Sequence, residues 1–344
     1  MTRPTIADIA SRAGVSKGAV SFALNGRPGV SEETRARILR IADELNWRPH
    51  SVARALGGAR ADTVGLVIAR PARTLGVEPF FGQLLSGLQA RLSADSIALQ
   101  LLIVEDVGAE IEIYRRWASE QRVDGLVLVD LQTRDPRLAV VEELGMPAVV
   151  VGGPAKTGSL CSVWADDRAA MMTLVDYLAA LGHTRIAHVA GKPEFRHTQR
   201  RARALRDAAG RLGLAQAVSL HTDFSDTEGA RTTRTLLSNK QRPTAIIYDS
   251  DLMAVAGLGV AMEMGVAVPG GLSIASFDDS VLTRLTHPAI TALSRDTYAF
   301  GMRAASALLD VMADPNAPRD IQTDTPSLTV RESTALLATA PKSV

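Results

Sequence analysis

Three short helical patterns of apolar side chains open the sequence. Apolar residues recur there at spacings of three and four, which is typical of amphipathic helices. Each pattern follows a hydroxyl residue, Thr5, Ser16 or Ser31, whose side chain can accept a free backbone N–H of the first helical turn. The residues expected to face inward are Ile6, Ile9, Ala10 and Ala13, then Ala19, Val20, Ala23 and Leu24, and finally Ile38, Ile41, Ala42 and Leu45.

Turn residues mark where these helices begin and end. Thr5-Ile6-Ala7-Asp8 fits a capping box, and Gly14 permits a tight turn after the first helix. Asn25-Gly26 ends the second helix. Three short helices, the first two joined by a tight turn, form a helix-turn-helix. The sequence therefore predicts an all-α helix-turn-helix domain over residues 1–48.

The segment Gly14-Val15-Ser16-Lys17-Gly18 also contains G-x-S-x-G, the pattern of a serine hydrolase's nucleophile elbow. Such an elbow needs an apolar strand immediately before the serine. The preceding residues 7–14 carry helical spacing instead. We therefore interpret Ser16 as a helix cap, and we expect its loss to lower stability rather than turnover.

Beyond residue 62, short apolar runs alternate with helical patterns. Helical patterns include Phe80 to Leu92 and Met171 to Leu181. This alternation predicts parallel sheets covered by helices. The region is longer than one such sheet needs, and Ala165-Asp166-Asp167 gives a boundary near its middle. The expected strands are Val64 to Ile68, Ile97 to Val104, Leu126 to Val129, Ala148 to Val151, Ile186 to Ala190, Ala245 to Tyr248 and Leu272 to Phe277.

Charge is divided unevenly along the chain. The 344 residues carry a formal net charge of +1, yet residues 1–60 hold ten Lys and Arg against five Asp and Glu, a net of +5. The remaining residues hold 28 basic against 32 acidic side chains, a net of −4. A small basic head on a mildly acidic body is typical of a nucleic-acid-binding module attached to another domain.

Composition is that of an ordinary globular protein, with 46% hydrophobic and 22% charged residues. No apolar run approaches the roughly 18 residues of a membrane span. The N-terminal MTRPTIADIA has no apolar signal core, and Cys161 is the only cysteine. We therefore expect a cytoplasmic protein without disulfides and without a membrane partner.

Residues 5–56 contain a characteristic series of motifs: A-x-x-A-G-V-S from Ala10 to Ser16, the pair Val20-Ser21, V-S-x-x-T-R from Val30 to Arg35, and L-N-x-x-P from Leu45 to Pro49. With these motifs, the stretch from Thr5 to Leu56 resembles the DNA-binding head of the LacI/GalR (lactose/galactose repressor) family. In that family the second helix lies in the major groove and its first residues contact base edges, as helix-turn-helix geometry requires. By position, the resemblance makes Lys17, Gly18 and Phe22 the base readers.

Each base reader has two interpretations. Lys17 can donate to guanine O6 and N7 or neutralise a phosphate. Gly18 has no side chain, so it either allows the helix backbone to approach the DNA closely or makes no contact with a base. Phe22, where many members carry arginine, can contact a thymine methyl or pack within the head, so the operator cannot be read by analogy. The full set of DNA-binding residues implied by the resemblance is Thr5, Ser16, Lys17, Gly18, Ser21, Phe22, Asn25, Arg54 and Leu56.

The segment Ser51 to Leu56 resembles the family's hinge helix. Alone in water so short a helix would fray, because nucleation is costly. Packed against a partner's copy on DNA it would become ordered, and Leu56 would wedge between minor-groove base steps. The alternative is a flexible linker ending at Gly57-Gly58. We assign residues 49–61 to a hinge helix and linker.

The rest of the chain resembles the α/β two-lobed, type I fold of periplasmic sugar-binding proteins. The resemblance predicts an effector-binding and dimerisation domain over residues 62–340, with a lobe boundary near 165. Because the family's chain crosses between lobes more than once, residues 294–322 are expected to return to the first lobe. The segments that carry the resemblance are Pro79 to Phe81, Ala180 to His183, Asp249 to Ala254 and Ser276 to Asp279.

Open parallel sheets bind ligands beyond the carboxyl ends of their strands, here in a cleft between the lobes. The resemblance implies that Arg201 contacts the effector, with Arg200 as a register alternative, and that Asp278 is the effector-contacting acid. Asp251 follows a strand and can accept hydrogen bonds from ligand hydroxyls or cap the next helix. The apolar candidates, which could equally be core residues, are Phe80, Phe81 and Phe224.

A sugar or sugar phosphate is the effector that the resemblance implies. Arg196-His197-Thr198 resembles the Arg-x-Thr loop of purine-responsive members, so Arg196 is a further candidate and a nucleobase stays an alternative. Gly152 stands where some sugar-binding members carry an acid, which removes one hydroxyl partner.

Motifs for catalysis, cofactors or metals are absent from the sequence. It contains no G-x-x-x-x-G-K-[ST], no H-E-x-x-H and no C-x-x-C, and Gly257-Leu258-Gly259 lacks the third glycine of a dinucleotide fingerprint. His183 and His188 lack the spacing of metal ligands. We therefore expect neither enzymatic activity nor a cofactor or metal.

These patterns predict a homodimeric transcription factor, a repressor, that binds a near-palindromic double-stranded DNA operator. A small-molecule effector would favour one arrangement of the lobes and so order or loosen the hinges. Whether it releases or promotes DNA binding stays open. The residues after Leu337 contain no heptad run, so no tetramerising coil is expected. The alternatives are a solute-binding receptor without DNA function and a hydrolase acting through Ser16.

Overall fold

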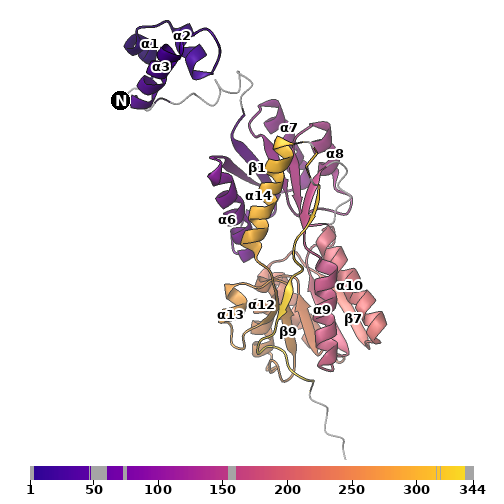
Figure 1. Ribbon diagram of the computed structural model, residues 1–344. Helices are drawn as coiled ribbons and strands as arrows, with labels where there is room; N and C mark the ends of the chain where they lie inside the picture. Colours follow the sequence, from indigo (N-terminus) through magenta and orange to yellow (C-terminus); the bar gives the residue numbers. More distant parts are fainter. Residues whose placement is uncertain are drawn as a thin grey trace, which may run out of the picture. The chain divides into compact units, whose positions relative to one another are not determined.

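The head and the body of the chain form separate units that divide between Ala61 and Asp62 (Figure 1). The computed structural model describes residues 4–45, 47, 60–72, 76–153, 160–314, 316–317 and 319–337. None of the helices in this described part of the chain combines the length and apolar character that a membrane crossing requires.

The head consists of α1 (Ile6–Ala13), α2 (Lys17–Leu24) and α3 (Glu32–Glu44). The predicted caps are confirmed: the hydroxyls of Thr5, Ser16 and Ser31 accept backbone N–H groups, and the Thr5–Asp8 capping box is closed in both directions. Gly14 adopts the left-handed conformation, with φ of 65°, which turns the chain between α1 and α2. The fully buried centre of the head is formed by Ile9, Val20 and Ile38, one residue from each helix.

The first lobe of the body is a six-stranded sheet in the order β11-β5-β4-β3-β1-β2, with every pair parallel. Apolar side chains from α6 and α14 pack on one face, and those from α7 and α8 pack on the other. The strands are β1 (Thr63–Ala69), β2 (Ala98–Val104), β3 (Gly125–Leu128), β4 (Ala148–Val151), β5 (Cys161–Trp164) and β11 (Asp320–Gln322). The helices are α6 (Pro79–Ala94), α7 (Val107–Ser119), α8 (Pro136–Glu143) and α14 (Thr297–Ala313).

The second lobe repeats this plan with the strand order β12-β10-β9-β8-β6-β7, in which β12 alone of the described strands is antiparallel. Helices α9 and α10 cover one face of the sheet, and α11 and α12 cover the other. The strands are β6 (Arg185–Ala190), β7 (Gln216–His221), β8 (Ala245–Tyr248), β9 (Ser273–Ser276), β10 (Thr291–Ser294) and β12 (Ser327–Thr329). The helices are α9 (Asp167–Ala180), α10 (Arg196–Leu212), α11 (Asp226–Leu237), α12 (Asp251–Glu263) and α13 (Val281–Leu285).

The C-terminal segment joins the two lobes a second and third time. After β10 the chain enters α14, which packs against α6, and β11 then pairs with β5 of the first lobe before β12 returns to the second. Helices α6 and α14 run side by side (Figure 1). They approach closely at two glycines, because a Cβ atom at Gly87 would lie 2.0 Å from the Tyr298 carbonyl oxygen and one at Gly301 would lie 2.4 Å from that of Leu84.

All seven strands expected from the sequence are present within a residue or two of their predicted bounds. Five further strands were not predicted: β5, β7, β10, β11 and β12. Three of these lie at sheet edges, where one side of the strand meets solvent and polar residues interrupt the apolar run. The remaining two, β5 and β10, are only four residues long and mix serine or threonine with apolar residues.

Candidate functional site

The first candidate site is the start of α2 in the head. The Ser16 hydroxyl accepts the Ala19 N–H at 3.2 Å, so this serine caps the helix. The preceding element is the helix α1 and not a strand, which removes the structural context of a nucleophile elbow. Lys17 and Gly18 follow on an exposed surface, where the dipole and free N–H groups of a helix start favour a phosphate.

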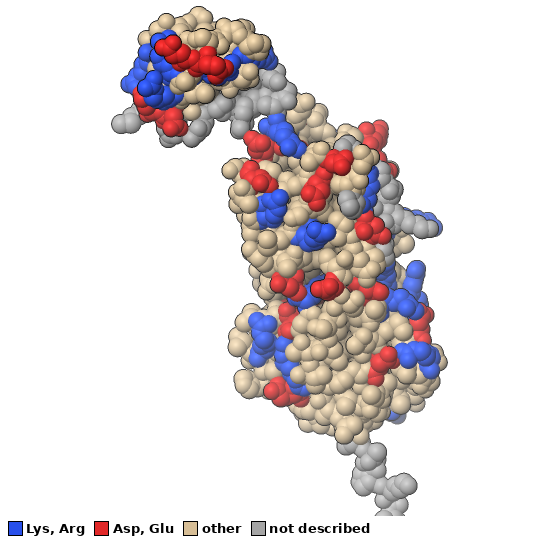
Figure 2. Space-filling model, viewed as in Figure 1, with Lys and Arg blue, Asp and Glu red and all other residues tan. Residues whose placement is uncertain are grey.

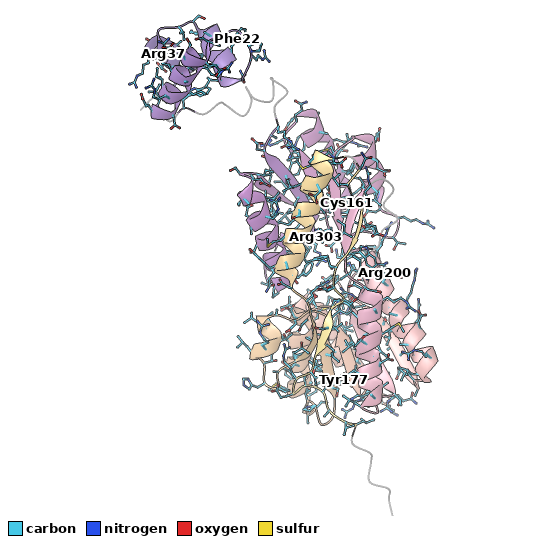
Figure 3. The ribbon with its side chains drawn as sticks, in the orientation of Figure 1. Phe22, Arg37, Cys161, Tyr177, Arg200 and Arg303 are labelled. Atoms are coloured by element: carbon cyan, nitrogen blue, oxygen red, sulfur yellow. The ribbon has the colours of Figure 1, made fainter. Side chains whose placement is uncertain are left out.

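Phe22 lies one turn further along α2 with 42% of its surface exposed (Figure 3). A Cβ atom at Gly29 would lie 3.1 Å from its ring, so one edge of the ring packs on the loop after α2. Arg35 holds this loop by donating to the carbonyl oxygens of Ala23 at 3.2 Å and Arg27 at 2.9 Å. The exposed part of the ring is thereby fixed in place and available for contact.

The other expected DNA contacts have local partners. The Thr5 hydroxyl donates to Asp8 at 2.7 Å, and the Asn25 amide donates to the Ser21 carbonyl oxygen at 2.9 Å. Both pairs are exposed to solvent, so the remaining donor groups of these side chains are accessible to a phosphate. Arg54 and Leu56 lie outside the described residues.

The second candidate site is a cleft where the two lobes meet. In Figure 2, basic and acidic side chains gather at the level of this junction. The cleft is open to solvent on one side and is lined by residues of both lobes, the kind of concave position at which proteins bind small molecules. The residues that line it are Arg70, Glu78, Phe80, Phe81, Val129, Asp130, Val151, Gly152, Ala165, Asp167, His197, Arg201, Phe224, Asp249, Ser250, Asp251, Asp278, Arg295 and Phe300.

Arg70 forms the polar wall on the side of the first lobe. Its guanidinium donates to both carboxylate oxygens of Asp130, at 2.5 and 2.9 Å, and to Glu78 at 2.9 Å. Burial raises the pKa of Glu78 to about 7 even though Arg70 opposes the rise. The Arg70 guanidinium also lies 4.6 Å from the centre of the Phe224 ring and 5.0 Å from that of Phe81, which is cation–π distance.

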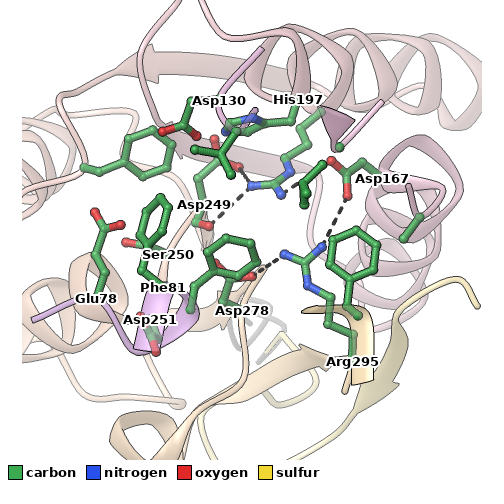
Figure 4. Close-up of a pocket in the computed structure, with 18 of the residues that line it drawn as sticks. Glu78, Phe81, Asp130, Asp167, His197, Asp249, Ser250, Asp251, Asp278 and Arg295 are labelled. Carbon is green, nitrogen blue, oxygen red and sulfur yellow. Dashed lines mark hydrogen bonds and ion pairs between the residues drawn. The ribbon is translucent and has the colours of Figure 1, made fainter. Parts of the chain in front are cut away.

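Arg201, on α10, is the buried cation of the second lobe. Its Nη1 donates to Asp249 at 3.1 Å, and its Nη2 lies 3.5 Å from Asp167. Burial alone would raise the pKa of Asp249, but His188, 3.0 Å away, and Arg201 together hold it well below its usual range. In Figure 4 a dashed line joins Asp249 to the guanidinium group with which it pairs.

Arg295 and Asp278 form a third ion pair at 2.8 Å (Figure 4). The Arg295 guanidinium lies 5.1 Å from the centre of the Phe80 ring. Asp278 follows β9 and Arg295 follows β10, so both stand beyond the carboxyl ends of neighbouring parallel strands. This is the position at which open α/β sheets bind ligands.

Asp251 differs from the other lining acids because it has no cationic partner within ion-pair distance in the described chain. Its Oδ1 accepts the Leu252 N–H at 2.7 Å, whereas its Oδ2 is buried without a hydrogen-bond partner. Burial, with the charge of nearby Asp278, raises the pKa of Asp251 to about 6. Asp251 is thus both the first residue of α12 and an acceptor at the cleft.

Apolar surfaces complete the cleft. Phe80, Phe81, Phe224 and Phe300 line it. Phe224 has a positive φ of 74°, and a Cβ atom at Gly191 would lie 1.8 Å from its ring. A strained backbone and an obligatory glycine therefore place this ring at the cleft.

Of the seven expected effector contacts, the structure brings six together in the cleft: Phe80, Phe81, Arg201, Phe224, Asp251 and Asp278. Arg196 is not among the lining residues, because its Nε donates to the Gln132 carbonyl oxygen across the lobe junction at 2.9 Å. The alternative Arg200 donates to the Gly153 carbonyl oxygen at 2.6 Å and lies at the lobe junction (Figure 3). His197, between them, lines the cleft, and burial lowers its pKa to about 4.

Several lining residues were not predicted from the sequence. Arg70, Asp130, Asp249 and Arg295 each follow a strand by one or two residues, which is the signal that singled out Asp251 and Asp278. Applied to every strand, this rule would have found them. Glu78 and Asp167 come from helix starts and carry no such signal. Within the described ranges, no group of three or more His, Cys, Asp or Glu is arranged to hold a metal ion.

Comparison with known proteins finds a family match for both the head and the body of the chain. Residues 5–50 match the family model for bacterial regulatory proteins of the lacI family, and residues 175–334 match a periplasmic binding protein-like domain. The HTH-type transcriptional regulator CelR from Thermobifida fusca is 31% identical over 96% of this chain and 98% of its own length.

Two solved structures extend this similarity to three dimensions. A LacI family transcriptional regulator from Bifidobacterium animalis subsp. lactis is 35% identical, with a TM-score of 0.74 over 81% of this chain and all of its own. The complex of the transcriptional regulator CelR with cellobiose is 30% identical, with a TM-score of 0.73 over 96% of this chain and all of its own. The chain therefore belongs to the lacI family of bacterial regulatory proteins and is a DNA-binding transcriptional regulator with a two-lobed periplasmic-binding-like domain.

Proposed function

We propose that this regulator is a dimeric repressor whose binding to a near-palindromic operator is controlled by a small, sugar-like molecule in the cleft. The observation that carries the proposal is the cleft itself. Its polar walls come from both lobes, Arg70 and Glu78 from the first and Arg201, Asp251 and Asp278 from the second.

A ligand held by both lobes changes the relative free energies of the arrangements that the two lobes can adopt. It stabilises the arrangement in which both walls reach it, and only this difference in affinity can produce a switch. The first lobe follows residues 49–61, which we propose as hinge helix and linker. Movement of the first lobe would therefore reach the DNA-binding heads through this short segment.

DNA recognition is assigned to the exposed start of α2. Lys17, Gly18 and Phe22 stand where a recognition helix enters the major groove. The Ser16 cap and the Arg35 contacts fix both ends of this helix, so the reading surface is preorganised before it meets DNA.

A sugar is the favoured effector class for two reasons. Aromatic rings can cover the C–H faces of a pyranose, while carboxylates and guanidinium groups bond its hydroxyls, and the cleft supplies both. The similar regulator CelR is solved in complex with cellobiose. A purine is the second candidate, but the Arg196 side chain that suggested it is bonded to Gln132.

Self-association is supported by apolar side chains left on the surface of the second lobe. Leu285 and Val281 on α13 are 71% and 49% exposed. A two-fold dimer repeats one such patch on both subunits and so buries it. Two linked heads would then read two half-sites about one helical turn apart.

The proposal is tested by selecting random DNA duplexes with the purified full-length protein at about 0.15 M salt, where non-specific binding is weak. We expect a near-palindromic motif, and we expect a member of a sugar panel to change the affinity for it. A purine panel is run in parallel. A motif without two-fold symmetry would contradict the dimer, and the absence of any motif under all conditions would contradict the assignment of the head as a sequence reader.

A further inference from the structure

The cleft holds more carboxylates than guanidinium groups. Its described lining contains six carboxylates, those of Glu78, Asp130, Asp167, Asp249, Asp251 and Asp278, but three guanidinium groups, those of Arg70, Arg201 and Arg295. His197 adds no charge near neutral pH, because burial lowers its pKa to about 4. Burial also raises the pKa of Glu78 to about 7, but even without the charge of Glu78 five carboxylates remain against three guanidinium groups, so the surface that meets the ligand is acidic.

The three guanidinium groups are already engaged. Arg70 is paired with two carboxylates and lies against aromatic rings. Arg201 is paired with Asp249, and Arg295 with Asp278. A phosphate or carboxylate ligand is bound tightly by an arginine that offers it two parallel N–H donors. Among the residues that the structure describes, the cleft offers no such arginine without first breaking an existing pair.

Two buried polar atoms of the lining residues have no partner, and they have opposite character. Asp251 Oδ2 is an acceptor and Arg201 Nε is a donor. Both residues are less than a twentieth exposed, at 3% and 4%. A buried polar atom without a hydrogen bond costs free energy, so each of these atoms points to a group that a ligand supplies. A hydroxyl can supply either, because it donates and accepts.

We propose that the cleft takes a polyhydroxy compound without negative charge, which donates to Asp251 Oδ2 and accepts from Arg201 Nε, and that it rejects the phosphorylated or carboxylated forms of the same compound. The inference rests on the proposed function and narrows it from sugars and sugar phosphates to sugars that carry no anionic group. An amino sugar satisfies the same chemistry, since its ammonium group also donates to Asp251.

The exclusion of anions follows from like-charge repulsion. A phosphate in the cleft would lie among carboxylates whose charges are only partly neutralised by arginines, and the burial of Asp249 and Asp251 weakens the screening of those charges by water. An arginine that is already paired, such as Arg295 with Asp278, could bind the phosphate only by leaving its carboxylate. The phosphate would then be neutralised, but the released carboxylate would not, so the cleft as a whole would gain no charge neutralisation.

The first test uses matched sugar pairs. The thermal midpoint and the binding isotherm of the full chain are measured with glucose, galactose and cellobiose, with glucose 6-phosphate and galactose 6-phosphate, and with glucosamine and glucuronate. We expect any stabilisation to come from neutral or amino sugars, with binding of the anionic counterpart at least tenfold weaker. An anionic sugar that binds as tightly as its neutral parent would overturn the proposal.

The second test needs no knowledge of the sugar. Inorganic phosphate is titrated against the wild type, the double variant Asp251→Asn/Asp278→Asn, and the control Asp207→Asn. The double variant removes the partnerless acid and leaves Arg295 without its 2.8 Å partner. The control also releases an arginine, Arg168, but from an exposed pair with no enclosing cleft. Circular dichroism checks that each variant is folded, and Asp278→Asn alone replaces the double variant if that variant fails to fold.

We expect saturable phosphate binding in the cleft variant, at least tenfold tighter than in the wild type and the control. Saturable binding to the wild type that is lost in Arg295→Gln would overturn the proposal, and so would a cleft variant that gains nothing. If no sugar binds, the sugar assignment and the proposed effector class fail, while the phosphate comparison still decides the charge selectivity by itself.

Discussion

The head and the cleft differ in how exposed their functional side chains are and in how far apart in sequence the paired residues lie. The reading surface of α2 is exposed, and its caps join residues close in sequence, such as Ser16 with Ala19 or Asn25 with Ser21. The charged side chains of the cleft are mostly buried, and their ion pairs include residues far apart in sequence, such as Arg70 with Asp130. A DNA reader must leave its donors free for phosphates and bases, whereas a small-molecule site must pair its charges until the ligand arrives.

This difference predicts that substitutions in the cleft cost stability first, and that substitutions in the head cost binding first. Removing one member of a buried pair leaves the other charge in a poorly solvated site. Removing an exposed side chain leaves only solvent behind, so the loss appears when DNA is added.

The largest effect is expected for Arg201→Ala. The substitution leaves Asp249 and Asp167 without their buried partner, so the free energy of unfolding of the body should fall by about 3–5 kcal/mol. We also expect the effector response to be lost while operator affinity is retained below the melting temperature. Denaturant unfolding compares it with the neighbouring Arg200→Ala, whose partner is the Gly153 carbonyl oxygen. Equal losses in the two variants would show that the Arg201 pairs are not specifically stabilising.

A smaller effect of opposite sign is expected for Asp251→Asn. Burial raises the pKa of Asp251 from 3.8 to about 6, so the folded state holds its proton more tightly than the unfolded state does. The wild type is therefore destabilised as pH rises from about 3.8 to about 6, because over this range the unfolded chain gives up the Asp251 proton before the folded chain does. Above about pH 6 the cost is complete, and well below pH 3.8 it is absent.

The asparagine variant should accordingly be more stable than the wild type at pH 8, by up to about 3 kcal/mol, since each pKa unit corresponds to about 1.36 kcal/mol. The difference should shrink to about 0.5 kcal/mol near pH 4. The difference between the two proteins is followed by denaturant unfolding from pH 4 to 8, which cancels the titration of the other carboxyls. A variant less stable than the wild type at pH 8 would contradict the assignment of Asp251 Oδ2 as a partnerless acceptor.

For the head, Lys17→Ala should weaken operator binding without changing stability. If Lys17 contacts a guanine, the loss of binding free energy should be about 1–3 kcal/mol, and the preference for one base pair of each half-site should relax. If Lys17 neutralises a phosphate, binding should weaken about equally for all sequences, and the slope of the logarithm of the binding constant against the logarithm of the salt concentration should become shallower by about one. Lys240→Ala, exposed on the body, is the control. Unchanged operator binding in Lys17→Ala would remove this residue from the interface.

The smallest effect is expected for Ser16→Ala, which removes one cap. We expect the head to lose about 1 kcal/mol, seen as faster hydrogen exchange of the first amides of α2 in the full chain. Ser16→Asn keeps a capping oxygen and should restore protection. Fast exchange in both variants would show that the serine does more than accept the Ala19 N–H.

The same contrast explains how much the sequence could predict. The three helices of the head, their caps and the turn at Gly14 depend on contacts within four residues, so a local pattern was sufficient. The sheets were predictable where strands are buried on both faces, as in β3 and β4. Edge strands such as β7 and β11 have mixed exposure and were missed.

The cleft was predicted only in part, for a physical reason. A strand end indicated Asp251, and the family resemblance indicated Asp278; Arg70 and Arg295 also follow strands directly. Which acid pairs with which arginine depends on the order of strands in the sheet, because Arg201 and Asp249 are 48 residues apart in sequence. No local pattern carries that information.

The central claim, that occupancy of the cleft controls DNA binding, is tested most directly by measuring operator affinity as a function of the bound sugar in the wild type and in Phe224→Ala. The operator and the sugar are those obtained from the duplex selection and the sugar panel. The account predicts a shift in operator affinity of roughly 5- to 150-fold in the wild type, and a much weaker response in Phe224→Ala at the same sugar concentration. A sugar that binds the wild-type cleft without changing operator affinity would contradict the claim, as would an undiminished shift in the variant.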